Sequence, residues 1–161
     1  MKSITVFLFL FNCITMFLLA QVEDPLKQQA IKDLDSKYNE YKSIALQIWD
    51  NAEVGFKEVK SSTLLQKTLL ANGFKVESGV AGMPTAFVAS YGNGEPVIGI
   101  LAEFDALPGL SQQAVPEKSP VAGKDAGHGC GHHLFGTASI AASIELKKSG
   151  LNSIKLHCLM F

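Results

Sequence analysis

The sequence lacks an excess of charge of either sign, and it is poor in cysteine. Its 161 residues carry 14 Lys and Arg against 15 Asp and Glu, a formal net charge of −1. We therefore expect no nucleic-acid partner, because such proteins carry a basic surface. The three cysteines form an odd set in a chain of this length, which excludes a disulfide framework. With 47% hydrophobic residues, the chain can build one domain with its own core.

One long apolar run is present, and it lies at the N-terminus. Residues 4–19 follow the basic start Met1-Lys2-Ser3 and are interrupted by only three polar side chains. This pattern predicts a signal peptide over residues 1–20 and hence a secreted or periplasmic protein. A membrane-spanning helix needs about 20 apolar residues, so we expect no stable membrane anchor. An uncleaved N-terminal anchor is the alternative.

Hydrophobic periodicity predicts three helices in the rest of the chain. Apolar residues that recur every three or four positions indicate one amphipathic helix of about six turns over residues 26–50. A second helix should begin with Ser61 or Ser62 as N-cap and end at Asn72-Gly73. A third, Ala-rich helix is predicted over residues 134–148.

Apolar and alternating runs predict strands at residues 74–77, 85–91, 97–101 and 153–157. The second and third strands should be joined by a tight turn at Gly92-Asn93-Gly94. The third has no polar alternation, so we expect it to be central and buried on both faces. Residues 109–127 form a long loop, which in a compact domain is either disordered or part of an active site. Helices and strands in this order indicate a layered α/β domain.

Two short stretches concentrate the chemically active residues. Glu103 and Asp105 follow the predicted central strand, at the edge of an α/β sheet where ligands bind. Two residues apart, they face the same way if the strand continues through them. Solvated turn residues are the structural alternative for this pair.

The second stretch, residues 127–133, holds three of the four histidines and Cys130. Glycines between them let the backbone aim Cys130 and His132 at a common point, and thiolate and imidazole are preferred ligands of zinc. The chain offers no second Cys/His pair at finger-like spacing, which favours an open catalytic site over a closed structural one. The alternative is a hydrolase in which Cys130 is a nucleophile activated by a histidine. His157 is predicted on a strand with a structural role.

Four stretches of the sequence match the motifs of a known family in order and spacing: Asn51-Ala52-Glu53-Val54-Gly55-Phe56, Gly79-Val80-Ala81-Gly82-Met83-Pro84-Thr85-Ala86, Glu103-Phe104-Asp105-Ala106-Leu107-Pro108-Gly109 and Gly127-His128-Gly129-Cys130-Gly131-His132. They resemble the amidohydrolase branch of metallopeptidase family 20, from about Leu26 to His157. The resemblance implies a phosphorylase/hydrolase-like α/β catalytic domain, interrupted by a dimerisation domain, in a full-length homodimer. It also implies a metallo-amidohydrolase that cleaves an N-acyl amino acid or a small peptide-like amide of the aminobenzoyl-glutamate kind.

The resemblance also implies roles for individual residues. Cys130 would bind or bridge two divalent metal ions, His132 would be a ligand, and Asp105 would orient a metal-bound imidazole. Zinc is favoured over manganese because one donor is a thiolate. Glu103 stands where other branches carry a ligand, and its role stays open, as does that of His128.

Two departures from the family pattern limit these expectations. His133 stands where the family commonly has Asn or Asp. After His157 the family continues into a Pro-Ala-Glu-Glu segment that supplies a general base and a ligand, whereas this chain reads Cys158-Leu159-Met160-Phe161. We therefore expect residues 21–161 to be a fragment, the N-terminal portion of the catalytic domain, inactive as it stands. A non-catalytic remnant that binds a metal or a partner is the alternative.

Overall fold

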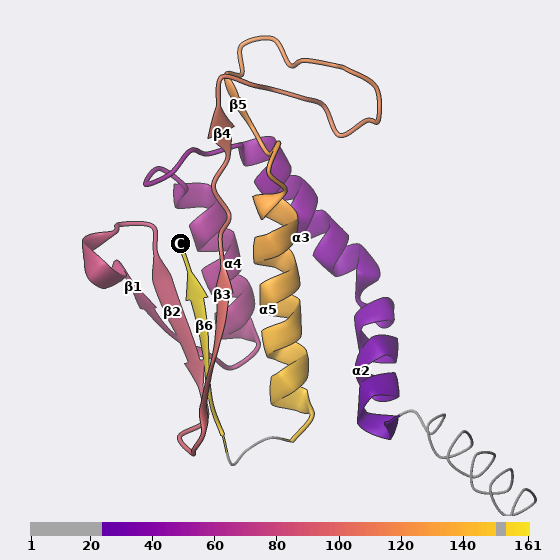
Figure 1. The fold of residues 1–161 in the computed structure, drawn as a ribbon, viewed down its shortest axis with the longest axis vertical. Coiled ribbons are helices and arrows are strands. Elements are labelled where there is room, and N and C mark those ends of the chain that lie inside the picture. Colours follow the sequence, from indigo (N-terminus) through magenta and orange to yellow (C-terminus); the bar gives the residue numbers. More distant parts are fainter. Residues whose placement is uncertain (1–23, 151–153) are drawn as a thin grey trace, which may run out of the picture.

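The computed structural model describes residues 24–150 and 154–161, and the predicted signal peptide lies outside them. Three helices come first along this part of the chain, and they are followed by five strands, a further helix and a last strand (Figure 1). The elements are α2 Pro25–Ser36, α3 Tyr38–Asn51, α4 Val59–Ala71, β1 Lys75–Ser78, a 3₁₀ turn Val80–Gly82, β2 Phe87–Tyr91, β3 Val97–Ala102, β4 Leu107–Pro108, β5 Ala126–Gly127, α5 His132–Lys148 and β6 Lys155–Met160. None of the helices in the described ranges has the length and apolar content to cross a membrane.

Four strands form a mixed sheet in the order β1-β2-β6-β3. Strand β6 is antiparallel to β2 and parallel to β3. Strands β2 and β3 are joined by a short connection, but they do not pair as the hairpin that the predicted tight turn implies, because β6 lies between them. The predicted central position of β3 is also wrong: within the described residues β3 is an edge strand, and Val97 and Leu101 are exposed.

Helix α5 connects the parallel strands β3 and β6, and with α4 it covers one face of the sheet (Figure 1). Strand β6 alternates accordingly: Leu156, Cys158 and Met160 are buried against the helices, whereas the residues between them are half-buried. Helix α3 packs outside α4 and α5 through Ile44 and Ile48. This layered α/β arrangement confirms the predicted fold class.

Two helix boundaries differ from the prediction. The single helix expected over residues 26–50 is two helices, broken at Lys37, whose φ of −101° and ψ of 9° leave the helical range. Helix α4 begins after Glu58 rather than at Ser61 or Ser62, both of which are buried inside it. Its first amide groups are bound by the carboxylate of Glu53, an acceptor that lies outside the helix and that no local capping pattern indicates.

The predicted long loop is present, but its two ends are paired as β4 and β5. It is also fastened to the C-terminal end of α3. The indole N–H of Trp49 donates to the carbonyl oxygen of Gln112 at 3.0 Å, and Lys124 forms an ion pair with Asp50 at 2.7 Å. The loop is therefore ordered by contacts with a helix, and it leads directly into the residues that precede α5.

We predict that Leu65→Ala lowers the free energy of unfolding by about 2–5 kcal/mol, because Leu65 is completely buried in the core and its removal leaves a cavity. Leu70→Ala, in the same helix, is the matched control, since Leu70 is 52% exposed. Urea denaturation followed by circular dichroism measures both. Equal losses for the two variants would contradict the packing described here.

Candidate metal centre

Glu103 and Asp105 follow β3 on a segment that the core holds in place. Phe104, between them, is fully buried and packs against Phe87, with ring centroids 6.2 Å apart. With Phe104 directed inward, the two carboxylates emerge on the other side of the segment, as alternation along an extended chain requires. Their side chains remain 47% and 30% exposed. The predicted common direction of Glu103 and Asp105 is thus observed.

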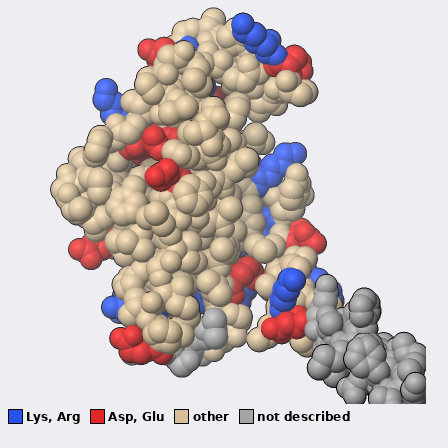
Figure 2. Space-filling model, viewed as in Figure 1, with Lys and Arg blue, Asp and Glu red and all other residues tan. Residues whose placement is uncertain are grey.

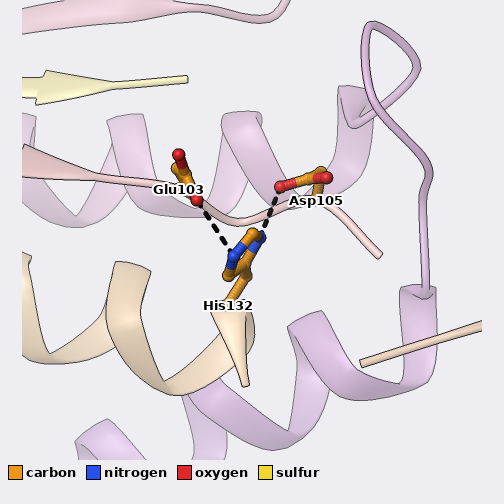
Figure 3. A group of neighbouring side chains, drawn as sticks. All are labelled: Glu103, Asp105 and His132. Carbon is orange, nitrogen blue, oxygen red and sulfur yellow. Dashed lines mark hydrogen bonds and ion pairs between the residues drawn. The ribbon is translucent and has the colours of Figure 1, made fainter. Parts of the chain in front are cut away.

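His132 is the first residue of α5 and reaches both carboxylates (Figure 3). Its Nδ1 donates to Asp105 Oδ1 at 2.6 Å, and its Nε2 lies 2.9 Å from Glu103 Oε2. One donor atom from each of the three residues lies within 4.8 Å of the other two. Two glycines help to bring them together. Gly131 turns into the helix with a φ of 84°, and a Cβ on Gly136 would lie 3.1 Å from the Glu103 carbonyl oxygen.

The charges of this group favour a cation. A single imidazole ring stands between the two carboxylates, with Asp105 at Nδ1 of His132 and Glu103 at Nε2. Two carboxylates carry more negative charge than one imidazole ring can compensate. Figure 2 shows the same face as Figure 1, and in its upper left part acidic side chains (red) are exposed among mainly uncharged residues (tan). Carboxylate oxygen and imidazole nitrogen are both suitable zinc ligands, so the donor set fits a divalent metal.

The structure joins two of the three predicted site residues. Asp105 and His132 are in direct contact, and Glu103, whose role was left open, completes the group. Cys130 is exposed and is not a member of this group. Its position two residues before His132 keeps it at the same end of α5. Its predicted role as a metal ligand stays a prediction.

The neighbouring histidines face the protein interior. His128 and His133 are 4% and 8% exposed, their ring centroids lie 5.0 Å apart, and the ring of Trp49 packs edge-on against His133. His128 Nε2 donates to the Ile48 carbonyl oxygen at 3.0 Å. Burial lowers the pKa of His128, and burial with the nearby His128 lowers the pKa of His133 to about 4. Both rings are therefore neutral near pH 7 and serve packing. His157, on β6, contacts Ser90 at 2.8 Å on the strand where it was expected.

A small pocket of about 180 Å³ adjoins the group, and Glu103 and Asp105 are among the residues that line it. Its lining also includes Glu58, which is buried and whose carboxylate accepts from the Thr85 hydroxyl at 2.6 Å. Sequence reasoning did not single out Glu58 as a site residue. No local pattern marks it, because its neighbours in the pocket come from the segment before β2 and from the segment after β3.

Comparisons with known proteins agree with the motifs. No family model matches the chain. The p-aminobenzoyl-glutamate hydrolase of Escherichia coli has a subunit that is 47% identical over 116 residues, which cover 71% of this chain and 24% of that protein. This similarity confirms the resemblance to metallopeptidase family 20. The four motifs also resemble those of aminobenzoyl-glutamate utilisation protein B, and the similarity to this subunit confirms that resemblance.

Two further proteins are similar to this chain, one in sequence and one in fold. The hippurate hydrolase of Campylobacter jejuni is 30% identical over 70% of this chain and 29% of its own length. A dinuclear metal-binding peptidase of the family from Bacillus subtilis has the same fold, with a TM-score of 0.64 at 22% identity over 78% of this chain and 35% of that one. The chain thus spans about a quarter of the length of the curated relatives it matches.

The buried His133 predicts a pH dependence of stability in the metal-free chain. The unfolded chain takes up this proton near pH 6.5, and the folded chain does so only near its lowered value of about 4. The unfolded state therefore binds more protons between these values, and the free energy of unfolding falls as the pH falls through this window. We expect His133 to contribute about 2–3 kcal/mol of this loss.

Urea denaturation at pH 7 and at pH 4, with a chelator present, measures the loss. His133→Asn, which installs a residue that the family commonly carries, should make the dependence shallower. His157→Asn is the control, because His157 lies on β6 away from this cluster. An unchanged dependence in His133→Asn would contradict the assignment.

Proposed function

We propose that this chain supplies part of the metal centre of a metal-dependent hydrolase that cleaves the amide bond of an N-acyl amino acid or a small peptide-like substrate. The observation that carries the proposal is the convergence of Glu103, Asp105 and His132 on one point, in a chain that resembles a family of peptidases and amidohydrolases. Export through residues 1–20 and dimerisation of the whole protein are part of the same proposal.

Each residue of the centre has a task that its contacts support. Asp105 accepts from His132 Nδ1, which fixes the tautomer and the ring orientation and leaves Nε2 for the metal. Glu103 adds a carboxylate at 2.9 Å from that nitrogen. Cys130 would add a thiolate from the turn before α5. When bound, the metal ions would act as Lewis acids toward the scissile carbonyl group.

The names of the relatives support the substrate class. One relative is part of a p-aminobenzoyl-glutamate hydrolase and another is a hippurate hydrolase, and both names describe an acyl group joined to an amino acid by an amide bond. The pocket beside Glu103 and Asp105 is partly apolar, with Phe56 and Phe161 in its wall. It supports a substrate that carries an apolar group near the amide.

We predict that the 161-residue chain binds zinc, and that His132→Ala and Asp105→Asn weaken binding. The Asp105 variant should lose about 10–100-fold in affinity, because an outer carboxylate that orients a ligand is typically worth that much. The His132 variant should lose more, since it removes a ligand. Competition with a chromophoric chelator measures the affinity. His157→Ala is the matched control and should bind zinc as the unchanged chain does. An affinity unaffected by either site variant would overturn the metal centre.

We also predict that the isolated chain does not hydrolyse hippurate in the presence of zinc, because two metal ions need more donors than converge in the described residues. Chelator-sensitive hydrolysis by the purified chain would contradict this. Hydrolysis that persists without metal and stops when Cys130 is alkylated would instead establish the thiol hydrolase. Failure to bind zinc as well would favour a remnant without a catalytic role.

A further inference from the structure

One of the four family-like stretches, residues 51–56, contributes no donor to the metal centre. It forms the start of the connection between α3 and α4, and Glu53 lies in its middle. We propose that Glu53 is a positioning residue, which fixes the segment that carries Asp105 and thereby aims Asp105 at His132. This proposal rests on the proposed function in one respect: Glu53 can affect metal affinity only if the centre binds a metal.

The side chain of Glu53 is fixed at the N-terminal end of α4. Its Oε1 accepts from the Lys60 backbone N–H at 3.0 Å, and its Oε2 accepts from the Ser61 backbone N–H at 2.9 Å. These amide groups belong to the first turn of the helix and have no partner within it. A carboxylate at this end is also stabilised by the helix dipole. Both oxygens are used, so the side chain has one orientation.

The backbone of Glu53 is fixed to the metal-centre segment. Its carbonyl oxygen accepts from the Ala106 N–H at 2.7 Å, and Val54 forms a parallel bridge with Ala106. Ala106 directly follows Asp105. On the other side of Asp105, Phe104 is fully buried. Asp105 is therefore held between a residue in the core and a residue bound to Glu53, and its carboxylate lies 2.6 Å from His132 Nδ1.

The backbone around Glu53 is strained. The residues of this connection would not adopt its conformation without contacts to the rest of the protein. Ala52 has a φ of 44° and Phe56 a φ of 66°, values that residues with a side chain rarely adopt. Strained residues of this kind persist where the surrounding contacts over-determine them, and they gather at functional sites. Here the contacts are those of Glu53 and, for Phe56, a hydrogen bond from its N–H to the Glu58 carboxylate at 3.0 Å.

Glu53→Gln tests the proposal with little change in size. An amide offers one acceptor oxygen in place of two, so one amide group of α4 loses its partner and the charge at the helix end is lost. The matched control is Lys147→Met, which removes a charged partner from the opposite end of α4. The Lys147 ammonium donates to the carbonyl oxygen of Asn72, the residue that ends the helix. This control weakens α4 without a contact to the Ala106 segment.

Two measurements on the 161-residue chain separate positioning from general stabilisation. The first is zinc affinity, measured together with the melting temperature. The second, made without metal, is the proton resonance of His132 Nδ1–H, which a short hydrogen bond to a carboxylate shifts strongly downfield. Asp105→Asn assigns this resonance by abolishing the shift.

We expect Glu53→Gln to lower zinc affinity at least about tenfold and to weaken the downfield shift, as the loss of an outer-shell contact does. Lys147→Met should lower the melting temperature to a similar degree and leave both signals unchanged. If Glu53→Gln lowers only the melting temperature, Glu53 merely caps the helix and the proposal is overturned. If the unchanged chain does not bind zinc, the proposed function fails, and the downfield resonance still decides the role of Glu53.

Discussion

The candidate centre depends on one hydrogen bond, from His132 Nδ1 to Asp105. It joins the segment after β3 to the first turn of α5, two parts of the chain that are separated by the long loop. At 2.6 Å, it is a short contact between a ring N–H and a carboxylate, which makes it stronger than a bond between neutral groups. If it broke, the ring would lose its orientation, and Glu103 and His132 would no longer present their donor atoms to the same point.

The rest of the structure serves to keep these two segments in place. Helix α5 lies close to the backbone at Glu103, because Gly136 has no side chain to hold it away. Phe104 and Phe87 secure the segment after β3 from inside, and Glu53 secures it from the side of α4. The core thus sets the positions of charged groups that would otherwise repel one another, and a bound cation would reduce that repulsion.

The four histidines show how environment separates residues of one type. His132 is half-buried between two carboxylates, where it can bind a metal. His128 and His133 lie in the interior, where burial disfavours the charged form, and they pack with Trp49. His157 joins two strands through Ser90. Three of these residues fall within six positions of the sequence, so composition and spacing could not assign their roles.

The sequence by itself determined the layered α/β class and the helix that ends at Lys148, because periodicity is a local property. Its short motifs also predicted Asp105 and His132 as site residues, and the structure places these two side chains in contact. It could not determine that β6 separates β2 from β3, since strand order depends on how α5 packs on the sheet. It also could not show that Glu103 joins the donor group, or that Glu53 binds both α4 and Ala106. Those contacts connect residues distant in the chain, and only the packing of the core brings them together.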